Sequence, residues 1–411
     1  MEKTIKGKRE PLFHLTRKQD VSLKSKWITR GVAIVVAFIL CAFVSSMMGG
    51  TFIDFFVKGF DACFVNLRDG GISATKVLSL LENMGILLLL AVSVIPAFKM
   101  KFWNIGAEGQ VIISILICCV LQKYIGDAWP IENNGGLRFL FFVIIFACSI
   151  LAGAIWGVIP AIFKAKFKTN ETLFTLMMNY VALILTKVVI SIWDPSQGSI
   201  DMFKDACYLP KIGGQSVVIN LIIIAIVVTL VFLFLKYTKR GYEISVVGGS
   251  PNTARYIGLS VKKTIIRTMI LSGALCGLCG VLIITGEHNN LTSTIVNGRG
   301  FTGVLIAWLS AFGPIELTLY SLLAAFMLKG GRAINYNVAF PKLMLAILFF
   351  VLIACDFFLN YRIHCEKLDN YLRAKFPRAF KNKQETKSTE EKPTNINDMN
   401  DNVALDKKGG K

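Results

Sequence analysis

Several common features are missing or scarce in this chain of 411 residues. It contains no GxxxxGK[ST] sequence, which excludes ATP binding by a phosphate loop of that type. Its three histidines, His14, His288 and His364, show no spacing typical of zinc ligands, so we expect no bound metal. Charged residues make up only 17% of the chain and hydrophobic residues 54%, which excludes an ordinary soluble globular protein and is typical of a polytopic membrane protein.

The apolar residues gather in runs long enough to enter a bilayer. The sequence predicts an all-α, polytopic transmembrane bundle of about ten segments, some of them broken or short. Two runs fall short of the roughly 20 residues that span hydrocarbon, which predicts broken or re-entrant helices. The short runs are 301–312 and 315–329, and the others are 31–48, 77–98, 103–121, 139–163, 172–193, 217–235, 264–285 and 342–359.

The net charge of +19 has a topological explanation. The first 30 residues hold nine basic and three acidic residues, and linkers rich in Lys and Arg alternate with linkers rich in Asp and Glu. This is the positive-inside pattern, so we expect a lipid bilayer rather than a nucleic acid as partner. The alternation places both termini in the cytoplasm, which requires an even number of crossings.

Composition divides the chain into three parts. Residues 1–30 form a basic cytoplasmic arm, with no evident secretory signal, and residues 31–361 form the transmembrane domain. Residues 362–411 form a cytoplasmic tail, which we expect to be disordered from about residue 381 because it has almost no large apolar side chains.

One stretch is badly suited to a continuous lipid-facing helix. Residues 103–110 read Trp-Asn-Ile-Gly-Ala-Glu-Gly-Gln, between apolar runs. Glycine weakens a helix, and a carboxylate near the membrane centre costs about 2.5 kcal/mol or more. Such a segment persists where it faces a protein-lined or watery path, so we interpret it as part of a permeation route.

A second informative stretch lies in the cytoplasmic loop 239–263. Ser250 is suited to cap a helix, Pro251 to begin it and Gly258 to end it. A short capped helix between two membrane segments is suited to transmit force from a soluble partner. An ordinary loop helix is the alternative on local pattern alone.

Small residues recur in the segment 264–285. Gly273, Gly277 and Gly280 predict close approach of neighbouring helix backbones. Two cysteines, Cys63 and Cys207, fall in linkers expected outside the cell, and whether they form a disulfide stays open because the distance between their Cα atoms does not follow from sequence.

Together these motifs resemble a known family. Residues 103–110 resemble the FNIGAEGQ signature of bacterial ATP-binding-cassette (ABC) permeases for nucleosides and simple, ribose-type sugars, with Trp103 in place of Phe. Residues 248–258 resemble their cytoplasmic coupling loop, and residues 300–307 their G-F-T-G-I-A-V-A run. Residues 272–280 and the stretch from Asn170-Glu171 to Asn179-Tyr180 are similar as well, in family order over about 77–331. Ala307-Trp308-Leu309-Ser310 departs from a common Leu-Leu-Gly-Arg, which leaves the substrate open.

The resemblance implies a transport subunit rather than an enzyme. Such a permease forms half of a membrane pore with a second, related permease, homologous or identical. A cytoplasmic ATP-binding cassette protein uses ATP, so no cofactor is expected on this chain, and an extracytoplasmic lipoprotein delivers the substrate. The implied location is the bacterial plasma (inner) membrane. Nucleosides, especially purine nucleosides, are favoured over ribose-like sugars by the FNIGAEGQ-like form.

Candidate functional residues follow from these motifs. Asn104, Glu108 and Gln110 could orient hydroxyls or ring nitrogens of a substrate, and Trp103 could stack on a base or sugar. An equally weighted alternative is that Glu108 only holds the interrupted helix by accepting hydrogen bonds from exposed amides. Asn179 shares a helix face with Thr175 and Thr186, and interhelical bonding is favoured over substrate contact there. The residues expected to couple to the ATPase are Gly249, Ser250, Pro251, Ala254, Arg255 and Gly258.

Two rival classes remain at this point. An intramembrane enzyme could use Glu108, Glu171 and the pair Glu287-His288, although their spacing matches no catalytic motif. A secondary transporter driven by protons or sodium could use Glu108 as its titrating group. Dependence on ATP or on an ion gradient separates the latter from a cassette permease.

Overall fold

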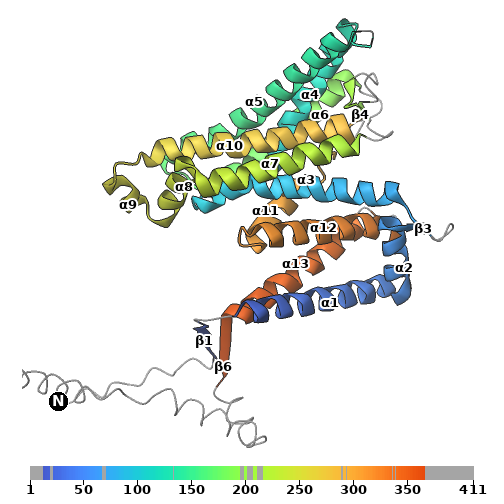
Figure 1. Ribbon diagram of the computed structural model, residues 1–411, viewed down its shortest axis with the longest axis vertical. Coiled ribbons are helices and arrows are strands. Elements are labelled where there is room, and N and C mark those ends of the chain that lie inside the picture. Colours follow the sequence, from blue (N-terminus) through green and yellow to red (C-terminus); the bar gives the residue numbers. More distant parts are fainter. Residues whose placement is uncertain are drawn as a thin grey trace, which may run out of the picture. The chain divides into compact units, whose positions relative to one another are not determined.

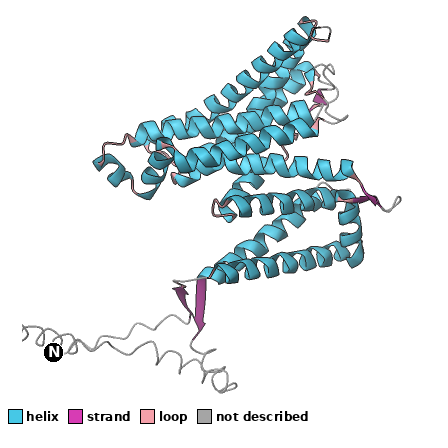
Figure 2. Ribbon diagram, in the orientation of Figure 1, coloured by secondary structure: helices cyan, strands magenta, loops and turns pink. Residues whose placement is uncertain are grey.

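The computed structural model describes residues 13–18, 22–66, 71–132, 134–194, 199–200, 207–210, 216–287, 290–292, 294–335, 337 and 339–365. Helices make up nearly all of this part, and the few strands are short (Figure 2). The predicted all-α class is therefore confirmed. The tail from about residue 381 lies outside the described residues.

Within the described ranges, nine helices are long and apolar enough to cross a membrane, which agrees with a polytopic bundle. They are α1 (Leu23–Met47), α3 (Ala74–Lys99), α4 (Ala107–Ala128), α5 (Gly135–Phe167), α6 (Glu171–Trp193), α7 (Val217–Tyr237), α10 (Val261–Leu282), α12 (Pro314–Ile334) and α13 (Ala339–Asn360) (Figure 1). The shorter helices are α2 (Phe52–Cys63), α8 (Lys239–Gly249), α9 (Pro251–Tyr256) and α11 (Arg299–Leu309), and a π-helical turn, η2 (Ile283–Glu287), continues α10.

The two helices predicted to be short have different outcomes. The run 301–312 contains α11, which has only 11 residues, so that prediction is confirmed. For the run 315–329 the prediction of a short helix is wrong. The helix found there, α12, continues to Ile334 and reaches 21 residues. The extension passes through Gly330, where a Cβ would lie 3.3 Å from the Cα of Gly59 in α2. Gly330 and Gly331 resemble the end of a helix in the sequence, but this close packing keeps them in helical conformation.

Three antiparallel strand pairs connect segments that are mostly distant in sequence. β1 (Phe13–Arg17) pairs with β6 (Tyr361–Cys365), β2 (Val65–Asn66) with β3 (Gly71–Ile72), and β4 (Ser199–Ile200) with β5 (Leu291–Thr292). The first pair belongs to a compact unit of residues 1–32 and 354–411, and residues 33–353 form a second unit. In the first unit, Arg30 and Asp356 form an ion pair at 3.7 Å.

The second unit has its core around α3, α4 and α10, which are the most deeply buried of its long helices. α10 packs closely along α5, and α3 contacts α7, α10, α11 and α12. The glycines of α10 allow this approach: a Cβ on Gly277 would lie 2.7 Å from the carbonyl oxygen of Ser149, and one on Gly280 would lie 2.8 Å from Ser114 Oγ. A Cβ on Gly273 would collide with the carbonyl oxygen of Gly153. Helix backbones are therefore in direct contact here.

Cys63 and Cys207 are both buried, and no disulfide joins them. Cys63 ends α2, and burial raises the pKa of its thiol to about 11. Cys207 packs against α4, where a Cβ on Gly126 would lie 2.8 Å from its Sγ.

Candidate functional site

The interruption predicted at residues 103–110 is present, between the end of α3 and the start of α4. α3 ends at Lys99, and Lys101 has a φ of 59°, a left-handed conformation that turns the chain. The amide of Phe102 then donates to the carbonyl of Ala97 at 3.0 Å. α4 starts only at Ala107, later than the predicted 103, so residues 101–106 form a non-helical segment, called the broken segment below.

Asn104 holds the broken segment from inside the bundle. Its side chain is fully buried. Its Oδ1 accepts from the amide of Gly106 at 3.0 Å, and its Nδ2 donates to Ser272 Oγ of α10 at 3.0 Å. Gln110, which is also buried, lies beside it with amide groups 3.4 to 3.5 Å apart. The two side chains therefore satisfy backbone and side-chain groups in a non-helical stretch that water cannot solvate.

Asn179 of α6 caps the beginning of α4. Its Oδ1 accepts from the amide of Gly109 at 2.8 Å, and its Nδ2 donates to the carbonyl of Ile105 at 3.0 Å. Gly106, the residue before α4, makes no side-chain cap of its own. A Cβ on Gly109 would lie 2.8 Å from Asn179 Oδ1, so glycine is needed for this contact. A side chain from another helix thus accepts the hydrogen bond of an amide that a local capping residue usually satisfies.

Glu108 plays the same part for α11. Its two carboxylate oxygens accept from the amides of Gly298 at 2.8 Å and Gly300 at 2.6 Å. Gly298 precedes α11 with no side-chain cap, and it has a φ of 83°. Glu108 also lies in the first turn of α4, so its carboxylate meets the amino ends of two helices, where negative charge is stabilised. The arrangement joins the start of α4, just after the broken segment, to the start of α11.

α11 begins inside the bundle. A Cβ on Gly303 would lie 2.8 Å from Leu90 Cβ, well inside α3 and nine residues before its end at Lys99. At a rise of about 1.5 Å per residue, this contact lies roughly 13 Å along α3 from that end. α11 is therefore a half-length helix beside the middle of a long one, and in Figure 1 it lies between α3 and α12.

The structure brings four of the five residues predicted for a substrate path into one buried cluster. Asn104, Glu108, Gln110 and Asn179 are at most 7% exposed and lie around the start of α4. Trp103 differs, because it is 45% exposed, and its ring is tilted against that of Phe98, with ring centroids 5.3 Å apart. Glu108 does accept hydrogen bonds from backbone amides, but these belong to the start of α11 and not to the interrupted helix, as the second interpretation had it.

Sequence reasoning missed Arg299, which begins α11. Its side chain is only 6% exposed, and one guanidinium nitrogen donates to Asn83 Oδ1 of α3 at 3.3 Å. The predicted segment began at Phe301 and so left this arginine in a linker. A cation directly next to the Gly-Phe-Thr-Gly run was the available signal, because charged residues within membrane bundles are commonly functional.

The loop 239–263 forms the predicted short helix. Ser250 Oγ accepts from the amide of Thr253 at 3.3 Å, Pro251 begins α9, and Gly258 has a φ of 81° just after it. Gly248, at the end of α8, packs so closely that a Cβ there would collide with the carbonyl oxygen of Lys99. α8 therefore contacts the backbone where α3 passes into the broken segment. On α9, Ala254 is fully buried and Tyr256 is 91% exposed.

Two other groups of residues bear on the rival chemistries. Glu171 pairs with Lys164 at 2.6 Å, and the described side chains contain no cluster of three or more potential metal ligands. His288 lies outside the described residues.

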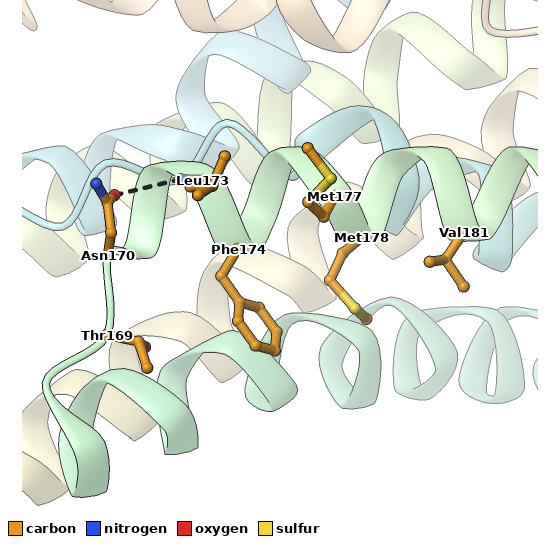
Figure 3. A pocket seen from close by; sticks show the side chains of 7 residues that line it. All are labelled: Thr169, Asn170, Leu173, Phe174, Met177, Met178 and Val181. Carbon is orange, nitrogen blue, oxygen red and sulfur yellow. Dashed lines mark hydrogen bonds between the residues drawn. The ribbon is translucent and has the colours of Figure 1, made fainter.

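An apolar pocket of about 390 Å³ lies along α6 (Figure 3). Phe174 and Met178 point toward α5 in this view, and Phe174 stacks on Phe163 with centroids 4.8 Å apart. The Asn170 Oδ1 already accepts from the amides of Thr172 and Leu173. The pocket therefore offers a polar ligand few hydrogen-bond partners and lies apart from the buried cluster.

Comparison with known protein families decides the assignment. The family model described as "Branched-chain amino acid transport system / permease component" matches residues 77–355, about two thirds of the chain. The chain belongs to this permease family. The match covers α4, α10 and α11, and hence all the contacts of Glu108. The permease is thus a multi-pass membrane transport component.

The permease is similar to curated transport proteins of three organisms. It is 27% identical to the nucleoside ABC transporter permease protein NupB of Lactococcus lactis, over 78% of this chain and 89% of that protein. It is 28% identical to the guanosine ABC transporter permease protein NupP of Bacillus subtilis, over 65% and 76%. It is 27% identical to the glucose ABC transporter permease protein TsgB13 of Haloferax volcanii, over 67% and 76%.

Proposed function

We propose that this chain is the permease subunit of an ABC importer that moves purine nucleosides across the plasma membrane. The observation that carries the proposal is the likeness to the nucleoside permease NupB, which extends over 78% of this chain and 89% of that protein. The likeness to a guanosine permease supports a purine substrate.

The broken segment and α11 are the parts that border the translocation path. Glu108, Asn104, Gln110 and Asn179 hold these two elements in place from the buried side, and Trp103 presents an exposed indole for stacking on a base or sugar. Because Glu108 bonds α11 and also begins α4, a shift of one element is transmitted to the other. This coupling supports a role in alternating access rather than in catalysis.

ATP hydrolysis takes place on a separate cassette protein that docks at α9. An exposed Tyr256 on a short capped helix gives such a partner an aromatic anchor. The coupling helix and its two ends contain the residues proposed for this contact, which are Gly249, Ser250, Pro251, Ala254, Arg255 and Gly258. Movement of α9 reaches the broken segment through α8, since Gly248 lies against the carbonyl of Lys99. Gly273, Gly277 and Gly280 keep α10 tightly packed as the bundle moves.

The topology has ten crossings. Nine crossings are the long helices of the described part. The tenth is made by the half-length helix α11 together with the chain that leads to it from β5. An even number places both termini on the same side of the membrane, and the charge pattern predicts that this side is the cytoplasm. A second permease completes the pore, and an extracytoplasmic lipoprotein delivers the substrate.

A sugar substrate is the second candidate. The glucose permease of Haloferax volcanii is as similar in identity, 27%, as the nucleoside permease of Lactococcus lactis. Its alignment covers less of this chain, 67% against 78%, which is why nucleosides come first.

Uptake by cells with and without this gene tests the proposal. We expect the deletion to abolish uptake of labelled guanosine and leave uptake of labelled ribose and glucose unchanged. Loss of sugar uptake alone would favour the second candidate. An Arg255→Ala variant should retain membrane insertion and lose uptake, whereas Lys187→Gln, an exposed cation on α6, should match the wild type. Normal uptake by Arg255→Ala would contradict the coupling role of α9.

A further inference from the structure

A pocket of about 450 Å³ lies at the entry to α11. This volume is within the range of about 300–1,000 Å³ that is typical of small-molecule sites. All of its lining residues except Ile295 have side chains that are able to form hydrogen bonds. The polar lining consists of Asn290, Thr292, Thr294, Asn297, Arg299 and Arg332.

The lining is held in a fixed conformation by a tight turn. Asn297 and Gly298 have φ values of 51° and 83°, and the amide of Arg299 donates to the carbonyl of Val296 at 3.0 Å. The left-handed conformation suits Asn and Gly. Arg299 is held from α3 by Asn83, at 3.3 Å. Arg332, near the end of α12, is exposed and contributes the second guanidinium.

The pocket is directly connected to the buried cluster. Arg299 lies between Gly298 and Gly300, the two residues whose amides donate to the carboxylate of Glu108. A ligand that moves the turn at Asn297 therefore changes the geometry of these two bonds. The turn at residues 297–300 therefore links the pocket to the carboxylate of Glu108.

The chemistry of the lining indicates a type of ligand. A guanidinium presents parallel N–H donors, and its best match among nucleobases is the O6 and N7 acceptor pair of a 6-oxopurine. Adenine replaces the O6 acceptor by an amino donor and fits less well. The amides and hydroxyls of Asn290, Asn297 and Thr294 can both donate to and accept from ribose hydroxyls.

We propose that this pocket is a binding site for 6-oxopurine nucleosides, with the base held by Arg332 and Arg299 and the ribose by the asparagine and threonine side chains. The proposal rests on the proposed function, because it assigns a base class to the same importer. It places substrate recognition on the permease itself, at the amino end of α11.

Protection of an introduced thiol tests the site. Thr294 is exposed and lines the pocket, so Thr294→Cys in the full importer complex should react with a membrane-impermeant thiol reagent, with the parent complex giving the background. We expect guanosine and inosine to slow this reaction at least fivefold, and adenosine and ribose to have less than a twofold effect. The same complexes are assayed for guanosine uptake, which tests the proposed function separately.

A second substitution tests the role of the guanidinium. Adding Arg332→Gln to Thr294→Cys should raise the guanosine concentration for half-protection roughly tenfold, the size expected for one bidentate arginine–base contact. Lys187→Gln removes an exposed cation outside the pocket and should leave that concentration unchanged. Guanosine uptake without protection would overturn the site and leave the proposed function standing. Equal protection by ribose would overturn the base assignment, and absence of both uptake and protection would overturn both proposals.

Discussion

Replacing Glu108 by Gln should loosen the start of α11. The carboxylate accepts two amide bonds, at 2.8 Å from Gly298 and 2.6 Å from Gly300. Glutamine keeps one acceptor oxygen and turns an NH₂ donor toward the other amide. Loss of one charge-assisted bond costs about 1.5–3 kcal/mol, and a buried amide left without an acceptor costs about 1–3 kcal/mol. Because these two costs overlap, we expect the free energy of local opening of α11 to fall by roughly 2–4 kcal/mol.

Hydrogen exchange read by mass spectrometry measures this opening. At a factor of ten for every 1.4 kcal/mol, peptides that cover the start of α11 should exchange roughly 30 to 700 times faster in Glu108→Gln. Peptides of α7 should be unaffected. Guanosine uptake should fall as well, because α11 would no longer move with the broken segment.

Glu171→Gln is the matched control. Glu171 also lies in the first turn of a helix, but it pairs with Lys164, whose side chain is 32% exposed. A partly exposed ion pair contributes about 0–1 kcal/mol, so exchange in α11 should not change. Equal exchange of α11 in wild type, Glu108→Gln and Glu171→Gln would refute the role of Glu108 as its cap.

Three further predictions concern packing and thiol chemistry. Gly277→Ala should lower the melting temperature of the detergent-solubilised protein, at a cost of about 1–3 kcal/mol, since its Cβ would lie 2.7 Å from a carbonyl oxygen of α5. Gly249→Ala, which has open space, should not change it, and an equal shift in both would contradict direct backbone contact. Gly248→Ala should reduce uptake more than Gly249→Ala, because the Cβ at residue 248 would collide with the end of α3. Equal uptake by the two variants would contradict transmission through α8. Cys63, with its pKa raised to about 11 by burial, should stay unmodified by maleimide at pH 7.5 and react after unfolding, and rapid labelling of the folded protein would contradict its burial.

Much of the architecture could be predicted from sequence because its causes are local. Apolar runs predict long helices, and Ser250, Pro251 and Gly258 predict a capped α9, which the structure contains. An interruption within residues 103–110 follows from the glycines and polar side chains of that stretch. α2 could have been predicted as well, because Thr51 and Asp54 form a capping box that is visible in the sequence.

The cluster around Glu108 could not be predicted in detail because its causes are distant in sequence. Asn179 caps a helix 70 residues away, and the bonds from Glu108 to α11 span 190 and 192 residues. A local pattern shows that α4 and α11 lack their own side-chain caps but not which helix supplies them. The pairing of β1 with β6 was missed for the same reason, since it joins segments from the two ends of the chain.

The most direct test of the account is guanosine transport by purified components in proteoliposomes. The permease is reconstituted with its proposed partners, a second permease, a cassette ATPase and a binding lipoprotein, and ATP is supplied on the cassette side. We predict accumulation of labelled guanosine that requires ATP hydrolysis, persists with a proton ionophore and is absent with labelled ribose. Uptake that follows an ion gradient without ATP, or accumulation of ribose but not guanosine, would contradict the account.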